Sequence, residues 1–179
     1  MSAKKRILIF LIFIAIFSIA YSIGSESKLS EDDSKSFIKQ FQSAVEGIDA
    51  LGIFAHNTSV ALPMFVPGFG VAWGSFAAYS TGLAFRALVS TTPILAKLPP
   101  LVLIYLSPFG VMEIIAYSIG MSRSFLLINA IVRKKPLRLE LRNTGIEIGI
   151  VIALLLTAGF IEYSMIQEFG SNIANIKKP

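Results

Sequence analysis

The sequence predicts an all-α fold: a polytopic helical membrane bundle of about five transmembrane helices, with one Pro/Gly-broken helix and an amphipathic outer helix. Hydrophobic residues make up 54% of the 179 residues and charged residues only 15%, and the mean hydropathy is +0.71. A soluble domain of this size has too little interior to bury so much apolar surface. Apolar runs long enough to cross a bilayer account for this composition.

Composition also restricts the chemistry. The chain has no cysteine, which excludes disulfides and thiolate metal sites, and its single histidine excludes a histidine cluster. No serine-hydrolase elbow or phosphate-binding loop occurs, and every aspartate lies outside the apolar runs. We therefore expect no enzyme activity, no cofactor and no metal. The net charge of +5 comes from basic residues beside apolar runs, which favours membrane orientation over nucleic-acid binding.

The N-terminal apolar run, residues 7–23, follows Lys4, Lys5 and Arg6. It is long enough to span a membrane. Residues 18–20 (Ser-Ile-Ala) resemble a signal-peptide cleavage site, but the run exceeds most signal-peptide cores. We favour an uncleaved anchor.

An acidic, polar segment follows and leads into an amphipathic pattern. Ser30 and Asp33 have the spacing of a helix-capping box. Apolar residues then recur every three or four positions across 34–52, which predicts an amphipathic helix. This helix lies on the membrane surface or covers the spans.

Proline and glycine divide the rest of the chain. Pro67-Gly68 is a turn signal after a short apolar run, and Pro108-Phe109-Gly110 splits the block that follows Pro100. The short piece 101–107 lies at the outer surface or re-enters the membrane. The predicted spans are 7–23, 51–66, 69–90, 109–132 and 141–165.

The distribution of basic residues predicts the orientation. Residues 4–6 and 133–142 are basic, whereas 24–53 holds six acidic residues against three lysines. The positive-inside rule places both basic clusters in the cytoplasm, so the protein is a multi-pass cell-membrane protein with a cytoplasmic N-terminus. The predicted organisation is an N-terminal anchor (1–23), an extracytoplasmic segment (24–52), a helical membrane domain (53–166) and a tail (167–179).

Small residues form two stripes within the spans. Gly70, Gly74, Ala78 and Gly82 recur every four residues, and Gly145 and Gly149 form a second pair. Such stripes let helix backbones approach closely. We interpret them as packing between helices of one chain, with a homo-oligomer interface as the alternative.

Arg86, Glu113, Arg123 and Glu147 lie inside predicted spans, where a charge is costly unless it is paired or faces water. Arg86 and Glu113 lie at similar depth near the outer boundary, and Arg123 and Glu147 lie deeper, toward the inner end. The depths predict two ion pairs, Arg86–Glu113 and Arg123–Glu147. A polar pathway between helices remains the alternative. His56 and Asn57, near the outer start of the second span, are interpreted as hydrogen-bonded structural groups.

Several short motifs carry a family resemblance. They include Phe54, Asn57, the Val60-Ala61-Leu62 triplet, a glycine-rich third span and the segment 106–113, LSPFGVME. Residues 53–121 resemble the stage II sporulation protein M family of integral membrane proteins. The positions that match its motifs are His56, Asn57, Pro108, Gly110 and Glu113, while Phe109 replaces the family's usual histidine.

The resemblance implies a membrane component without enzymatic activity. In endospore-forming bacteria the namesake acts with partners that remodel the septal wall, and that role is not carried over to this chain. We expect a scaffold or partner-recruiting subunit whose partners are membrane lipid and either other membrane proteins or further copies of itself. A small transporter or channel subunit is the alternative function.

Overall fold

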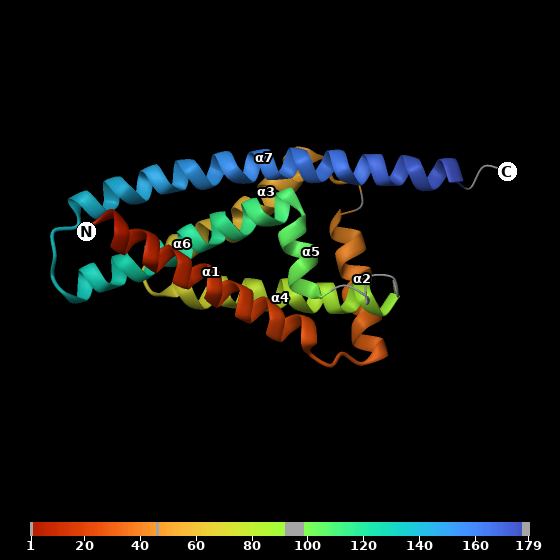
Figure 1. Cartoon of the computed structure of the whole chain (residues 1–179), viewed down its shortest axis with the longest axis horizontal. Helices are drawn as coiled ribbons and strands as arrows, with labels where there is room; N and C mark the ends of the chain where they lie inside the picture. Colours follow the sequence, from red (N-terminus) through yellow and green to blue (C-terminus); the bar gives the residue numbers. More distant parts are fainter. Residues whose placement is uncertain (1, 46, 92–98, 177–179) are drawn as a thin grey trace.

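The computed structural model describes residues 2–45, 47–91 and 99–176, and all the regular structure in these ranges is helical. Figure 1 shows the arrangement. The elements are α1 (Ala3–Glu26), α2 (Glu31–Val45), α3 (Ala50–Ala61), the 3-10 turn η1 (Leu62–Phe65), α4 (Phe69–Thr91), α5 (Pro100–Leu106), α6 (Pro108–Val132) and α7 (Arg138–Ile176). The predicted all-α membrane fold is confirmed.

Three helices are long and apolar enough to cross a membrane: α1, α6 and the 138–168 part of α7. The predicted count of five spans is not established by the same criteria. α3 has only 12 residues before it tightens into η1, where Pro63 lies in the first turn. α4 has 23 residues, but its glycines, hydroxyl groups and Arg86 lower its hydropathy.

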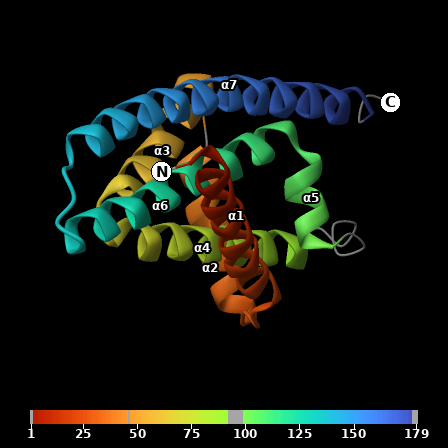
Figure 2. The same ribbon diagram turned by 60° about the vertical axis from the view of Figure 1, so that its left-hand side comes forward.

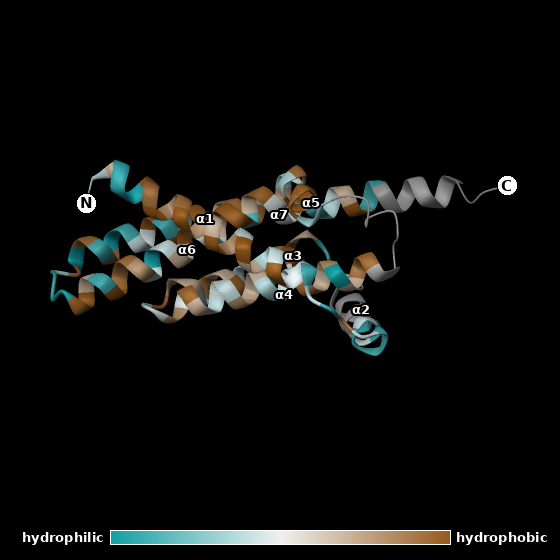
Figure 3. Cartoon of the chain, turned by 60° about the horizontal axis from the view of Figure 1, so that its bottom comes forward, coloured by the Kyte–Doolittle hydropathy of each residue, from teal (hydrophilic) through white to brown (hydrophobic). Residues whose placement is uncertain are grey.

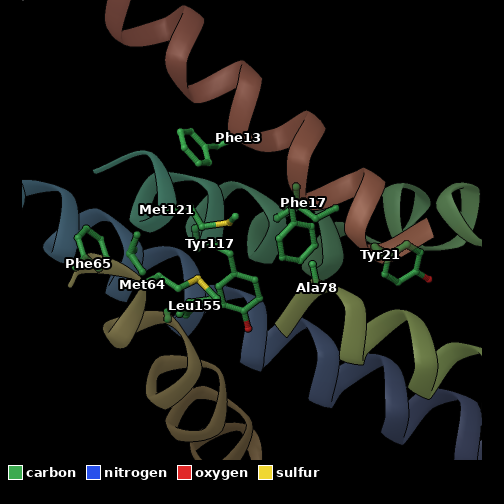
Figure 4. Packing of buried hydrophobic residues seen from close by; sticks show 13 residues of the cluster. Phe13, Phe17, Tyr21, Met64, Phe65, Ala78, Tyr117, Met121 and Leu155 are labelled. Carbon is green, nitrogen blue, oxygen red and sulfur yellow. The ribbon is translucent and has the colours of Figure 1, made fainter. Parts of the chain in front are cut away.

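α6 is the central helix of the bundle. Within its apolar window 67% of the residues are buried, against 22% for α1 and α7. Figure 4 shows aromatic side chains of α1 packing toward α6, and Met64 and Phe65 of η1 approaching it from another side. The core contains Phe13, Phe17, Tyr21, Ala61, Met64, Phe65, Ala78, Ile114, Ala116, Tyr117, Met121, Val151 and Leu155.

The segment after α1 forms two helices with other boundaries than the sequence predicts. Ser30 caps α2, accepting a hydrogen bond from the Asp33 amide at 3.1 Å, as the capping-box pattern predicts. The amphipathic helix ends at Val45 instead of continuing to residue 52. Gly47 has a φ of +72°, which interrupts the helix, and Asp49 caps the start of α3.

The structure adds detail to the sequence prediction for α5 and α7. α5 stands steeply against α6 and connects it to the α4 end of the molecule (Figure 2). Ser107 separates the two helices and accepts a hydrogen bond from the Gly110 amide at 3.2 Å. α7 has 39 residues and continues as helix through most of the predicted tail. It projects beyond the bundle at its C-terminal end in Figure 1.

The glycine stripe of α4 packs inside the chain. A Cβ built on Gly82 would strike the backbone carbonyl of Tyr21 in α1, and one on Gly24 would strike the carbonyl of Tyr79. Gly70 meets the carbonyl of Met64 in the same way, and Gly74 meets the Met121 side chain. Ala78 is fully buried. The stripe therefore lets α4 approach α1, η1 and α6, as predicted.

Candidate functional site: two polar clusters in the bundle

The first cluster is an ion-pair tetrad formed by Arg6, Arg123, Glu140 and Glu147. Arg123 lies on α6 with only 3% of its side chain exposed. It donates to both carboxylate oxygens of Glu147, from Nε at 2.7 Å and from Nη2 at 2.6 Å. Its Nη1 donates to Glu140 Oε2 at 2.8 Å. This two-pronged geometry suits a guanidinium held between two acids.

Arg6 completes the tetrad from the start of α1. Its Nε and Nη2 donate to Glu147 Oε1 at 3.0 and 2.9 Å, and its Nη1 donates to Ser122 Oγ at 2.9 Å. Glu147 thus lies between two arginines. Two positive and two negative groups balance, which offsets part of the cost of placing charge among apolar helices.

The tetrad joins three separate parts of the sequence. The Arg123–Glu147 contact is the one that their matched depths predicted. Arg6 was interpreted only as an orienting charge, and Glu140 was not singled out. A useful signal was their spacing on α7: Glu140 and Glu147 are seven residues apart, so they share one helix face.

The second cluster surrounds Glu113. Asn57 of α3 donates from Nδ2 to Glu113 Oε1 at 2.7 Å. Both residues are positions of the family motif, and they lie 56 residues apart in sequence. Pro108 and Gly110 shape the start of α6 one turn earlier, where Ser107 caps the helix. Glu113 is therefore not the group that satisfies the backbone at the Pro108-Phe109-Gly110 break.

The predicted pairing of Arg86 with Glu113 is not formed. Glu113 takes the neutral amide of Asn57 as its partner, and the Arg86 side chain is exposed on α4. The physical reason is helix rotation. A spacing of four residues advances about 400° in an α-helix, so each step of the stripe drifts by about 40°. By Arg86 the stripe has left the packed face that contains Ala78 and Gly82.

Glu162 of α7 is the neighbouring acid. It is close enough to Glu113 for like-charge repulsion, and it lines an open surface cavity of about 360 Å³ together with Phe109, Met165 and Ile166. No lysine or arginine forms an ion pair with either acid within the described parts of the chain. Sequence reasoning missed Glu162 because it lies near the predicted outer boundary. We call Glu113 and Glu162 the carboxylate pair.

His56 is not part of either cluster. Its side chain is exposed, and its backbone carbonyl accepts a hydrogen bond from Ser59 Oγ at 2.7 Å. The described residues contain no group of three histidine or acidic side chains arranged to hold a metal ion.

Comparison with known proteins identifies the family. No curated protein and no solved structure matches the chain. The chain matches the family described as Stage II sporulation protein M over residues 7–163. The match extends beyond the segment whose motifs carry the resemblance and includes most of α1 and all of α2. This chain belongs to the stage II sporulation protein M family of membrane proteins.

Proposed function

We propose that the protein is a non-enzymatic scaffold or partner-recruiting subunit of a complex in the cell membrane, with its N-terminus in the cytoplasm. The observation that carries this proposal is the outward face of α7. Gly145 and Gly149 have open space where a side chain would stand, with no heavy atom within 4 Å. Ala153 and Thr157 continue the same spacing of four, and all four residues are exposed.

Comparison with α4 indicates that this outward stripe on α7 could contact another helix. On α4, the same pattern of small residues holds the backbones of α1 and η1 in contact. On α7 the pattern has no neighbour in the described chain. Small residues in a membrane helix are favoured where another helix approaches closely, so a helix of a partner or of a second copy fits this face.

The interior supports scaffolding over catalysis or conduction. The tetrad neutralises its own charges, and Arg123 is almost completely buried. His56 is exposed, and among the described residues no hydrogen bond joins its imidazole to a serine, as a base-activated nucleophile requires. A tetrad that neutralises its own charges favours a structural role for this part of the bundle.

Co-purification tests the proposal directly. The tagged protein is extracted from its native membrane into nanodiscs, and its mass and co-purifying proteins are determined. We expect a partner or second copy at a fixed ratio. Gly149→Leu and Ala153→Leu should reduce that ratio several-fold without lowering the thermal stability of the isolated chain, because both face open space.

Ala15→Leu is the matched control, since Ala15 is a small exposed residue on α1, outside the α7 stripe. It should leave the ratio unchanged. A wild-type chain that remains monomeric, with no stoichiometric partner, would contradict the scaffold role.

The carboxylate pair supports a second candidate function, a small transporter or channel subunit. Glu162 lines the cavity, and neither Glu162 nor Glu113 has a cationic partner among the described residues. Unpaired acids within membrane helices are typical of polar intramembrane pathways. Ion flux in reconstituted vesicles distinguishes the functions. Flux that Glu113→Gln abolishes would favour transport, and absence of flux together with a stable complex would favour the scaffold.

A further inference from the structure

We propose that the end of the bundle formed by the start of α1 and the α6–α7 loop is a binding surface for the phosphate headgroups of anionic phospholipids. Its residues, called the basic rim, are Lys4, Lys5, Arg133, Lys134, Lys135, Arg138 and Arg142. All seven side chains are exposed. The inference concerns a lipid site and is independent of the partner surface on α7.

The fold brings the basic rim together from two distant parts of the sequence. Figure 1 shows the start of α1 at the same end of the bundle as the α6–α7 loop and the start of α7. The 2.9 Å contact between Arg6 and Glu147 joins the start of α1 to the first part of α7. Residues separated by about 130 positions in sequence therefore contribute to one charged surface.

The acidic side chains at this end of the bundle are already paired with arginines. Glu140 and Glu147 are the acids nearest the rim in sequence, and both are bound by the arginines of the tetrad. Among the described residues, none of the seven rim side chains forms an ion pair. α1 adds to the positive potential, because it starts here with no acidic residue in its first turn and no side-chain cap.

The α6–α7 turn presents its lysines outward. The amides of Arg133, Lys134 and Lys135 donate to the carbonyls of Asn129, Ile131 and Ala130, respectively, which closes the end of α6. Lys134 has a φ of +50°, the left-handed conformation that reverses the chain. The backbone groups are satisfied within the turn, and the Lys134 and Lys135 side chains are exposed.

Exposed apolar residues place the basic rim at headgroup depth. Val132 is 72% exposed, Leu141 60% and Leu139 58%, and these alternate with the basic residues. Figure 3 shows the hydrophilic start of α1 and the α6–α7 turn directly beside hydrophobic helix surface. Apolar side chains in the acyl region beside cations at its boundary fit a phospholipid better than a soluble polyanion.

Lipid binding by the detergent-purified full-length chain tests this proposal. Native mass spectrometry counts bound phosphatidylglycerol and, separately, phosphatidylcholine. We expect selective retention of phosphatidylglycerol. The variant Lys134→Gln/Lys135→Gln/Arg138→Gln should bind it about 100-fold more weakly, because each basic residue near an anionic surface strengthens binding by about fivefold.

The matched control is Lys28→Gln/Lys35→Gln/Lys39→Gln, which removes three exposed lysines at the opposite end of the bundle. It should leave phosphatidylglycerol binding unchanged. Lys4→Gln/Lys5→Gln removes an independent part of the rim and should weaken binding even if the triple variant fails to fold.

Three results would overturn the inference. One is equal retention of the two lipids. Another is equal weakening by the rim and control variants. The third is competition by inorganic phosphate or a short DNA duplex as strong as that by phosphatidylglycerol, which would show that the rim recognises soluble anions instead of lipid.

Discussion

Single residues decide how charge is tolerated inside this bundle. Arg123 is held by two acids, and Glu147 is shared by two arginines. Glu113 instead accepts a hydrogen bond from the amide of Asn57. An ion-pair tetrad and an amide–carboxylate contact are two different solutions to the same desolvation cost.

The tetrad makes a prediction for stability. Arg123→Gln or Glu147→Gln should each lower the free energy of unfolding by about 3–5 kcal/mol, because each leaves buried charge without its partner. The double variant should lose less than the sum. Equilibrium unfolding in detergent micelles measures all three.

Arg86→Gln is the control for this series. The Arg86 side chain is exposed, so its substitution should change stability by less than about 0.5 kcal/mol. A loss as large as that of Arg123→Gln would mean that Arg86 does pair with an intramembrane acid.

At the scale of elements, small residues determine which helices touch. α1 and α4 cross where Gly24 and Gly82 each face a backbone carbonyl of the other helix. A backbone cannot move aside without displacing its whole helix, whereas a side chain such as Met121 opposite Gly74 can change rotamer. The four-residue repeats in α4 and α7 look alike in sequence but differ in surroundings.

This difference predicts an order of effects. Gly82→Leu should destabilise the protein most, Gly74→Leu less, and Gly145→Leu least, since a side chain at position 145 meets open space. The midpoints of thermal unfolding in detergent give the order. Equal sensitivity at all three positions would contradict the observed packing.

At the scale of the whole molecule, the long helices α1, α4 and α7 run in one direction between two ends, and α6 runs back (Figure 1). One end holds the basic rim, and the other holds the acidic start of α2 and the projecting C-terminal part of α7 (Figure 1). At about 1.5 Å per residue, the 39 residues of α7 span nearly 60 Å, about twice the bilayer core. Part of α7 therefore extends beyond the membrane.

Cysteine labelling tests the orientation, and the chain has no cysteine of its own. We expect Asp32→Cys to react with an impermeant reagent added outside intact cells and Lys135→Cys to react only after lysis. Both side chains are exposed, whereas Ser34, a natural choice from sequence, is buried. The reverse labelling pattern would invert the proposed topology.

The sequence by itself determined the membrane class, the positions of the apolar helices, the Ser30 cap and the breaks at Gly68 and Pro108. These depend on composition and on residues close together in the chain. It also placed charges by depth, because depth follows from counting residues along a helix.

The tertiary structure alone decided which groups meet. The depth of each residue along its helix correctly predicted that Arg123 pairs with Glu147, but it also predicted the pair Arg86–Glu113, which does not form. Depth contains no information about rotation around the helix axis. Rotation and tilt are set by packing among helices distant in sequence, such as the close contact of α1 with α4. Because of that packing, Arg86 is exposed and Glu113 accepts a hydrogen bond from Asn57. Gly145 and Gly149 face open space.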